Sequence, residues 1–275
     1  VLLNPAAAAQ GPHVLHEAFP IRVATLGRRL AELHLALSLG DSAAFRPEPM
    51  PDSYFQNVGD AIALQLAAAF EALARAERQF DEGTRADVQA LTANRHRLVS
   101  FLHEALPTDA RVIGTRLHGD LHLGQVLAAQ NDWYVLGFEG DPARSLAERR
   151  AKAPPLRDVA AMLRSFDAAG RFVAADRARM VPNAAADAER HALEWRDAVR
   201  TVFVHAYEQT AANAPGFPAD ESLRKRLLDL YAFEKAVYEI TVEAANRPAW
   251  LRIPVRGLLE LIGLAGTGTP NAPPQ

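Results

Sequence analysis

Three short β-like runs between residues 110 and 140 interrupt an otherwise helical sequence, and this interruption limits the folds open to the chain. The first run is "ARVIGTRLHGD" (110–120), and "GQVLAA" and "DWYVLGFEG" follow with a "QND" turn between them. Apolar residues recur at helical spacing from Phe19 to Leu39 and again after Pro155. The pattern predicts an α+β, mostly α-helical fold with a small embedded β hairpin.

The remaining pattern predicts the order of the helices. The first ends at Gly40 and Asp41, and a proline-broken loop follows it. A second helix is expected after a cap at Asp52 or Ser53, with an apolar side made by Leu64, Leu66, Phe70 and Leu73. Further helices are predicted at about 84–105, after Pro155, and at about 187–213 and 220–245. Residues 1–12 are expected to be a linker, 13–265 one domain with its catalytic segment at about 110–170, and 266–275 a disordered tail.

Charge and composition narrow the possible partners. The net charge is −3, so there is no electrostatic reason to expect nucleic acid or an anionic membrane as a partner. No stretch approaches the ~20 apolar residues of a membrane span. Cysteine is absent, which excludes thiolate metal sites and fits a cytoplasmic location. The chain begins without Met and without a signal-peptide pattern, so we expect a fragment or a processed chain.

The segment 116–142 carries residue types that phosphoryl transfer needs. A kinase-type site uses a loop aspartate for the attacking hydroxyl, an amide five residues later for one metal ion, and an aspartate at the end of the next strand. Asp120 and Gln125 have the first spacing, whereas Gly137 stands where the second aspartate is expected. His118 is a catalytic-loop candidate too, and we expect it to brace the loop rather than act as a base.

The motifs "RLHGDLHLGQVL" and "FEGDPARSLAERRAKAPPLRDVAAMLRSFD" resemble the maltokinase family, especially the maltokinase-like half of trehalose synthase fusion proteins. Residues 26–37 and 227–262 are similar to further segments of that family, so the resemblance covers about 17–263. It implies the C-terminal lobe of a protein-kinase-like, aminoglycoside-phosphotransferase-like fold that uses ATP and Mg²⁺ to make maltose 1-phosphate, in trehalose or glycogen metabolism. Nothing before residue 110 resembles a phosphate-covering loop or a β-strand lysine, so the N-terminal lobe is expected to be absent.

Carried over by position, the resemblance makes Asp120 the catalytic carboxylate and Gln125 a nucleotide and magnesium ligand. Gly137 departs from the pattern at the principal metal-binding aspartate. On an extended strand, residues 137 and 139 face the same way, so Glu139 is a candidate replacement ligand. Two alternatives stay open: an inactive pseudokinase-like scaffold or regulatory module of a trehalose synthase, and a phosphotransferase for another small hydroxylated acceptor.

The acceptor is expected to lie against the last long helix. Glu234, Tyr238 and Glu239 combine an aromatic face with carboxylates, as sugar sites do, although a core tyrosine beside exposed acids is equally compatible. Asp158 is expected either to cap its helix or to brace the catalytic loop. The basic run of Arg144, Arg149, Arg150, Lys152 and Arg157 is interpreted mainly as a solvated face, with contact to phosphate or to the activation segment as the alternative.

Overall fold

The computed structural model describes residues 11–181, 183 and 185–264. Their contacts divide the chain into two compact units. The first unit holds the described residues up to Asp52 together with Ala110–Leu228, and the second holds Ser53–Asp109 and the described residues from Asp229 onward. The whole predicted catalytic segment therefore lies in the first unit.

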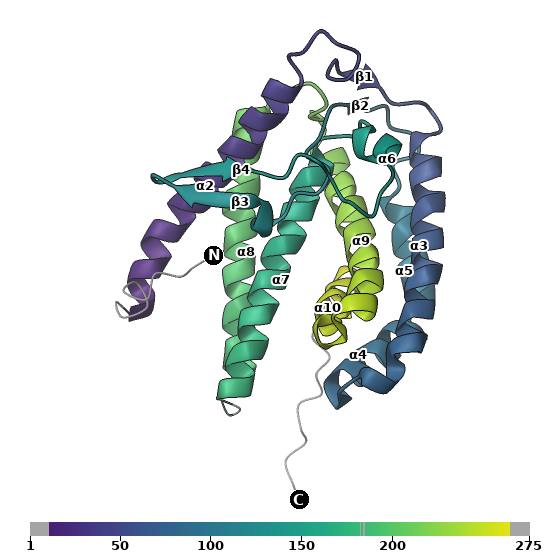
Figure 1. The fold of residues 1–275 in the computed structure, drawn as a ribbon, viewed down its shortest axis with the longest axis vertical. Coiled ribbons are helices and arrows are strands. Elements are labelled where there is room, and N and C mark those ends of the chain that lie inside the picture. The colour runs from purple at the N-terminus through teal and green to yellow at the C-terminus, as the bar shows by residue number, and fades with distance from the viewer. Residues whose placement is uncertain (1–10, 182, 184, 265–275) are drawn as a thin grey trace, which may run out of the picture. The chain divides into compact units, whose positions relative to one another are not determined.

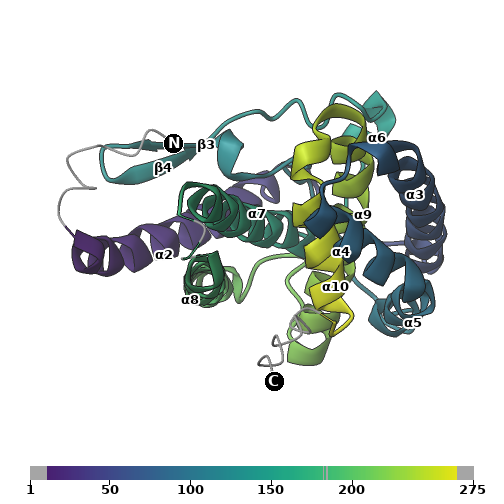
Figure 2. The ribbon, with the colours of Figure 1, turned by 90° about the horizontal axis from the view of Figure 1, so that it is seen from below.

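Three long helices build the first unit: α2 (Gly11–Leu37), α7 (Leu156–Met180) and α8 (Ala185–Ala211). Figures 1 and 2 show them side by side, with α8 packed against both of the others. Phe166 of α7 meets Phe203 of α8 edge to face, with ring centroids 5.4 Å apart. Gly27 allows α2 to approach α8 closely, because a Cβ atom at this position would collide with the carbonyl oxygen of Phe203.

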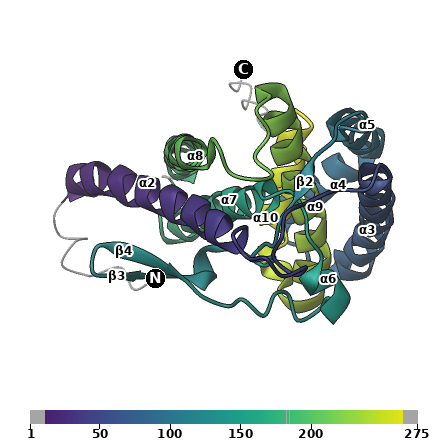
Figure 3. The ribbon, with the colours of Figure 1, turned by 90° about the horizontal axis from the view of Figure 1, so that it is seen from above.

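The embedded β element is a hairpin, as the sequence predicts. Strand β3 (Val126–Ala129) pairs antiparallel with β4 (Asp132–Val135), and the turn residues Gln130 and Asn131 have φ values of 50° and 63°. Figures 2 and 3 show the hairpin and α8 on opposite sides of α2. Asp132 accepts two hydrogen bonds from the Arg29 guanidinium, at 2.8 and 2.7 Å, which fasten the hairpin to α2.

The first β-like run contributes much less strand than the sequence suggests. Only β2 (Ile113–Gly114) is extended and paired, and its partner is β1 (Glu48–Pro49), inside the proline-rich loop. Thr115 adds one bridge to Ala153. At the end of the run, the N–H groups of residues 118–120 are bonded to side chains rather than to a neighbouring strand, as described below. The short helix α6 (Leu146–Arg150) follows the hairpin and begins with a capping box of Ser145 and Glu148.

The second unit contains helices and their connections: α3 (Tyr54–Ala76), η1 (Glu77–Gln79), α4 (Glu82–Ala93), α5 (Arg95–Ala105), most of α9 (Glu221–Asn246), η4 (Pro248–Trp250) and α10 (Arg252–Leu261). The single helix expected at 84–105 is in fact two, because Asn94 leaves the helical conformation with φ −106° and ψ 24°. Leu64 was placed on the wrong side of its helix: it is 74% exposed, whereas Ile62 and Leu66, two residues away on either side, are buried.

The predictions for the two ends of the chain fall largely on residues that the structure does not describe. The linker at 1–12 falls there except for Gly11 and Pro12, which belong to α2. The tail at 266–275 falls there entirely. Among the described helices, none is long and apolar enough to span a bilayer.

Candidate functional site

Asp120 lies in an irregular loop between β2 and the short 3-10 turn η2 (Leu123–Gln125). The loop turns at Gly119, whose φ of +84° is accessible at low cost only to glycine. Asp158, near the start of α7, holds this turn: its carboxylate accepts the N–H groups of His118 at 2.7 Å and of Gly119 at 3.0 Å. Of the two roles that the sequence left open for Asp158, the structure therefore shows the bracing of the loop.

The Asp158 carboxylate is buried, with 2% of the residue exposed. Burial by itself raises its pKa, but the hydrogen bond from His34, the neighbouring imidazole rings of His34 and His118 and the N–H of Gly119 lower it, and the net pKa lies below the ordinary value. Asp158 is thus an ionised acceptor, which strengthens its hydrogen bonds to the loop backbone.

His118 connects the loop to the end of the hairpin. Its Nε2 lies 2.6 Å from the carbonyl oxygen of Leu136, and its Nδ1 lies 3.3 Å from the backbone nitrogen of Asp120. A carbonyl needs a donor and an N–H needs an acceptor, so both contacts are satisfied by the neutral ring with its proton on Nε2. Both ring nitrogens contact the backbone, so His118 is placed as a brace of the loop, as expected from the sequence, and a catalytic role for it stays a prediction.

Gln125 lies directly beside Gly137. The backbone N–H of Leu136 donates to the carbonyl oxygen of Gln125 at 2.9 Å, which places the strand end next to η2. Gly137 has a φ of +78°, and a Cβ atom there would collide with Oε1 of Gln125 and lie 2.5 Å from its Cδ. The segments of Asp120, Gln125 and Gly137 therefore converge, and the Gln125 amide fills the space that a side chain at 137 would need.

Sequence reasoning missed two residues that shape η2. Oγ of Ser165 on α7 accepts the N–H of Leu123 at 3.0 Å, and Nδ1 of His122 accepts the N–H of Gly124 at 3.0 Å. His122 stands directly before the turn, as capping residues do, so the position was a detectable signal. Ser165 was not detectable, because it is 42 residues away in sequence.

The residues present do not fit a kinase-type magnesium site. Among the side chains that the structure describes, no three from His, Cys, Asp or Glu are grouped so that they could share a metal ion. Glu139 does not replace the missing carboxylate in the predicted way, because β4 ends at Val135 and residues 138–139 form a turn, so strand alternation does not apply. The Glu139 side chain is exposed, and its carbonyl oxygen accepts from Nη1 of Arg149 at 3.0 Å.

The proposed acceptor residues lie on the part of α9 that belongs to the second unit. Glu234 is buried, whereas Tyr238 and Glu239 are half-buried. Nζ of Lys235 lies 5.4 Å from the centroid of the Tyr238 ring, a cation–π arrangement. The acceptor role of these three residues stays a prediction.

The basic run serves the fold at several positions. The Nζ atom of Lys152 donates to the carbonyl oxygens of Ala43 and Arg46, both at 2.7 Å, and pairs with Glu48 at 3.0 Å, while its side chain is only 7% exposed. Lys152 therefore fastens the loop that follows α2 to the segment before α7. Arg144 lies 3.9 Å from Asp141, and Arg149 braces the turn at Glu139.

Replacing Lys152 with Met is expected to lower the free energy of unfolding by about 1–3 kcal/mol, because two loop carbonyls lose their donor. Denaturant unfolding measures the change. Arg150→Met, an exposed position in the same run, is the matched control and should stay within about 0.5 kcal/mol of the unmodified protein. Equal effects of the two variants would contradict the anchoring role.

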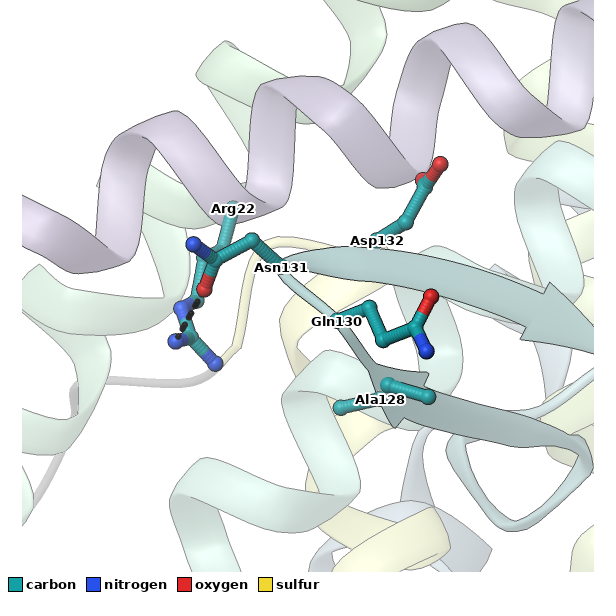
Figure 4. Close-up of a pocket in the computed structure, with 6 residues that line it drawn as sticks. Arg22, Ala128, Gln130, Asn131 and Asp132 are labelled. Atoms are coloured by element: carbon teal, nitrogen blue, oxygen red, sulfur yellow. Dashed lines mark hydrogen bonds between the residues drawn. The ribbon is translucent and has the colours of Figure 1, made fainter.

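A hollow of about 450 Å³ lies at the tip of the hairpin (Figure 4). Its lining comes from Arg22 of α2 and from residues 128–132, and Arg22 donates to the Asn131 side chain at 3.3 Å. None of the predicted site residues lines this hollow. The candidate functional site is therefore the loop around Asp120 and not this hollow.

Comparisons with known proteins point to sugar kinases. No protein-family model matches the chain. A glucosamine kinase of Streptacidiphilus jiangxiensis is 32% identical over 146 residues, which are 53% of this chain and 31% of that protein. A glucosamine kinase of Mycolicibacterium smegmatis is 33% identical over 152 residues, 55% of this chain and 35% of the other.

The fold agrees with this relationship. A glucosamine kinase structure in complex with glucosamine, ADP and inorganic phosphate superposes with a TM-score of 0.70 at 25% identity, covering 88% of this chain and 55% of that chain. A second crystal form of a glucosamine kinase gives the same TM-score and covers 53% of its chain. The chain is therefore related to glucosamine kinases and resembles them in fold, but it matches about a third of the curated relatives' length and about half of the solved chains.

Proposed function

We propose that this chain carries the catalytic loop of an ATP-dependent sugar phosphotransferase. One observation carries the proposal: the backbone on the N-terminal side of Asp120 is held by Asp158 and His118, and His118 also contacts the carbonyl oxygen of Leu136, whose N–H donates to Gln125. Such an arrangement presents one carboxylate on a rigid loop, as phosphoryl transfer requires. The relationship to glucosamine kinases supports the sugar as acceptor and, through the complex with ADP and phosphate, ATP as donor.

In this proposal Asp120 orients the acceptor hydroxyl and takes its proton as the oxygen attacks the γ-phosphorus and ADP leaves. No other residue of this chain is assigned a chemical step. Because the residues beside Gln125 do not fit a magnesium site, no step of the proposed reaction is assigned to a metal ion.

Glucosamine is our first candidate acceptor, because the curated relatives carry that name. Maltose is the second, from the maltokinase resemblance of the motifs around Asp120. An N-terminal kinase lobe and a trehalose synthase domain are the partners that this resemblance implies, and both remain proposals.

A second candidate function is a sugar-kinase-like binding module that does not transfer phosphate. Gly137 favours it, because the backbone offers no carboxylate at the strand end and the Gln125 amide occupies the space. The two candidates share a fold and differ only in turnover.

One assay separates them. The purified protein is incubated with ATP and either glucosamine or maltose, while ADP release and the phosphorylated sugar are followed by a coupled assay and mass spectrometry. Sugar-dependent ADP formation that disappears in Asp120→Asn is expected for the phosphotransferase. Binding of ATP or sugar by calorimetry without any phosphorylated product supports the binding module, and absence of both binding and turnover contradicts both candidates.

A further inference from the structure

A buried chain of hydrogen bonds reaches the Asp120 loop from two helices that contribute no residue to it. Oδ2 of Asp158 lies 3.2 Å from Nε2 of His34 on α2. Nδ1 of the same imidazole lies 2.8 Å from the hydroxyl oxygen of Tyr207 on α8. Residues 34 and 158 are 2% exposed and residue 207 is 1% exposed, so these contacts are shielded from water.

The three groups can form a chain in which every donor faces an acceptor. Burial, and then the charge of Asp158, raises the pKa of the Tyr207 hydroxyl well above its usual range, so this group stays protonated and can donate. With Tyr207 donating to Nδ1, the His34 ring carries its proton on Nε2 and donates that proton to Asp158. Each donor thus serves the next acceptor, and the chain ends on an ionised carboxylate.

Packing alone does not account for this arrangement. The rings of His34 and Tyr207 meet edge to face, with centroids 5.6 Å apart and an interplanar angle of 79°, which an apolar pair could reproduce. A buried carboxylate, however, needs several donors to remain ionised. Two come from the backbone N–H groups of His118 and Gly119, and the His34 ring supplies a third.

We propose that His34 and Tyr207 are positioning residues of the candidate catalytic loop. Tyr207 sets the tautomer of His34, and His34 holds the Asp158 carboxylate in the orientation that receives the two loop N–H groups. Asp158 in turn keeps Gly119 in its left-handed conformation and so places Asp120. The catalytic consequence rests on the proposed phosphotransferase function, whereas the structural consequence for the loop does not.

Native-state amide hydrogen exchange tests the structural consequence without any activity. In His34→Leu, the amides of His118 and Gly119 are expected to exchange about tenfold faster, because their acceptor loses a donor that orients it. His34→Gln retains an N–H donor and should recover most of the protection, and Tyr207→Phe should give an intermediate effect. Val199→Ala, a buried change on α8, controls for general destabilisation. In this variant the two amides should exchange no faster than its lower global stability alone predicts.

Kinetics test the catalytic consequence. In the sugar kinase assay, His34→Leu is expected to lower kcat about ten- to a hundredfold with KM for ATP nearly unchanged, and His34→Gln to recover kcat. Loop exchange in His34→Leu that equals the unmodified protein, or a kcat loss in Val199→Ala as large as in His34→Leu, would overturn the proposal. If the unmodified protein has no kinase activity, the proposed function fails, and the exchange experiment alone decides whether the positioning chain exists.

Discussion

Gly137→Asp is expected to raise the affinity for Mn²⁺ or Mg²⁺ about a hundredfold and sugar-dependent phosphoryl transfer about a thousandfold. The added carboxylate would lie beside the Gln125 amide, and an amide with an aspartate is the ligand pair of kinase metal sites. A thousandfold corresponds to about 4 kcal/mol of transition-state stabilisation, a plausible size for one metal ligand. Calorimetric metal titration and the coupled assay measure the two effects.

The backbone opposes this substitution, so it needs a matched control. At a φ of +78° a non-glycine residue is strained, although aspartate tolerates this region better than most, and the Gln125 side chain must move away. Gly137→Ala meets the same strain and the same collision without adding a carboxylate, so it should lose about 1–2 kcal/mol of stability and gain no metal affinity. Identical behaviour of the Asp and Ala variants would show that the strand end is not a latent metal site.

Asp167→Asn is expected to lower the free energy of unfolding by about 3–5 kcal/mol, because breaking a buried ion pair leaves uncompensated charge. The Asp167 carboxylate, 3% exposed, accepts from Arg164 at 2.7 Å and Arg171 at 3.0 Å within α7, and from Arg196 of α8 at 2.9 Å. The three arginine side chains are at most 9% exposed. Thermal and denaturant unfolding measure the loss.

The same carboxylate gives stability a defined pH dependence. Burial raises the pKa of Asp167, but the charges of Arg164 and Arg171 and the hydrogen bonds from Arg196 and Arg171 lower it, and the net pKa lies far below the ordinary value. A carboxylate with a depressed pKa stabilises the fold at neutral pH, and this contribution is lost as pH falls below about 4. The difference in stability between the unmodified protein and Asp167→Asn should therefore narrow below about pH 4.

Asp176 provides the matched control on the same helix. It pairs with Arg179 at 2.7 Å, but the two side chains are 42% and 81% exposed. Asp176→Asn should change the free energy of unfolding by less than about 0.5 kcal/mol, with no added pH dependence. A loss as large as that of Asp167→Asn would mean that burial does not set the strength of these pairs.

Features that depend on neighbours in the chain could be predicted from the sequence. The turn at Gln130 and Asn131 follows in part from Asn131, a residue type that accepts positive φ, and the positions of α7 and α9 follow from apolar spacing. The offset of five residues between Asp120 and Gln125 is likewise local. The alternation of side chains along a strand was wrongly applied to Glu139, because β4 ends at Val135.

The contacts that shape the candidate site depend on distant residues. His118 and Gly119 receive their acceptor from Asp158, 40 and 39 residues away, and the partner of His34 on α8 is 173 residues away. The position of the Gln125 amide over Gly137 likewise depends on how η2 meets the strand end. The sequence by itself determined most of the helices, the hairpin and the residue types available for phosphoryl transfer, because periodicity and turn preference act over a few residues. Only the tertiary structure decided which buried donors meet which acceptors, because burial removes water as an alternative partner and makes each such pairing depend on the packing of whole helices.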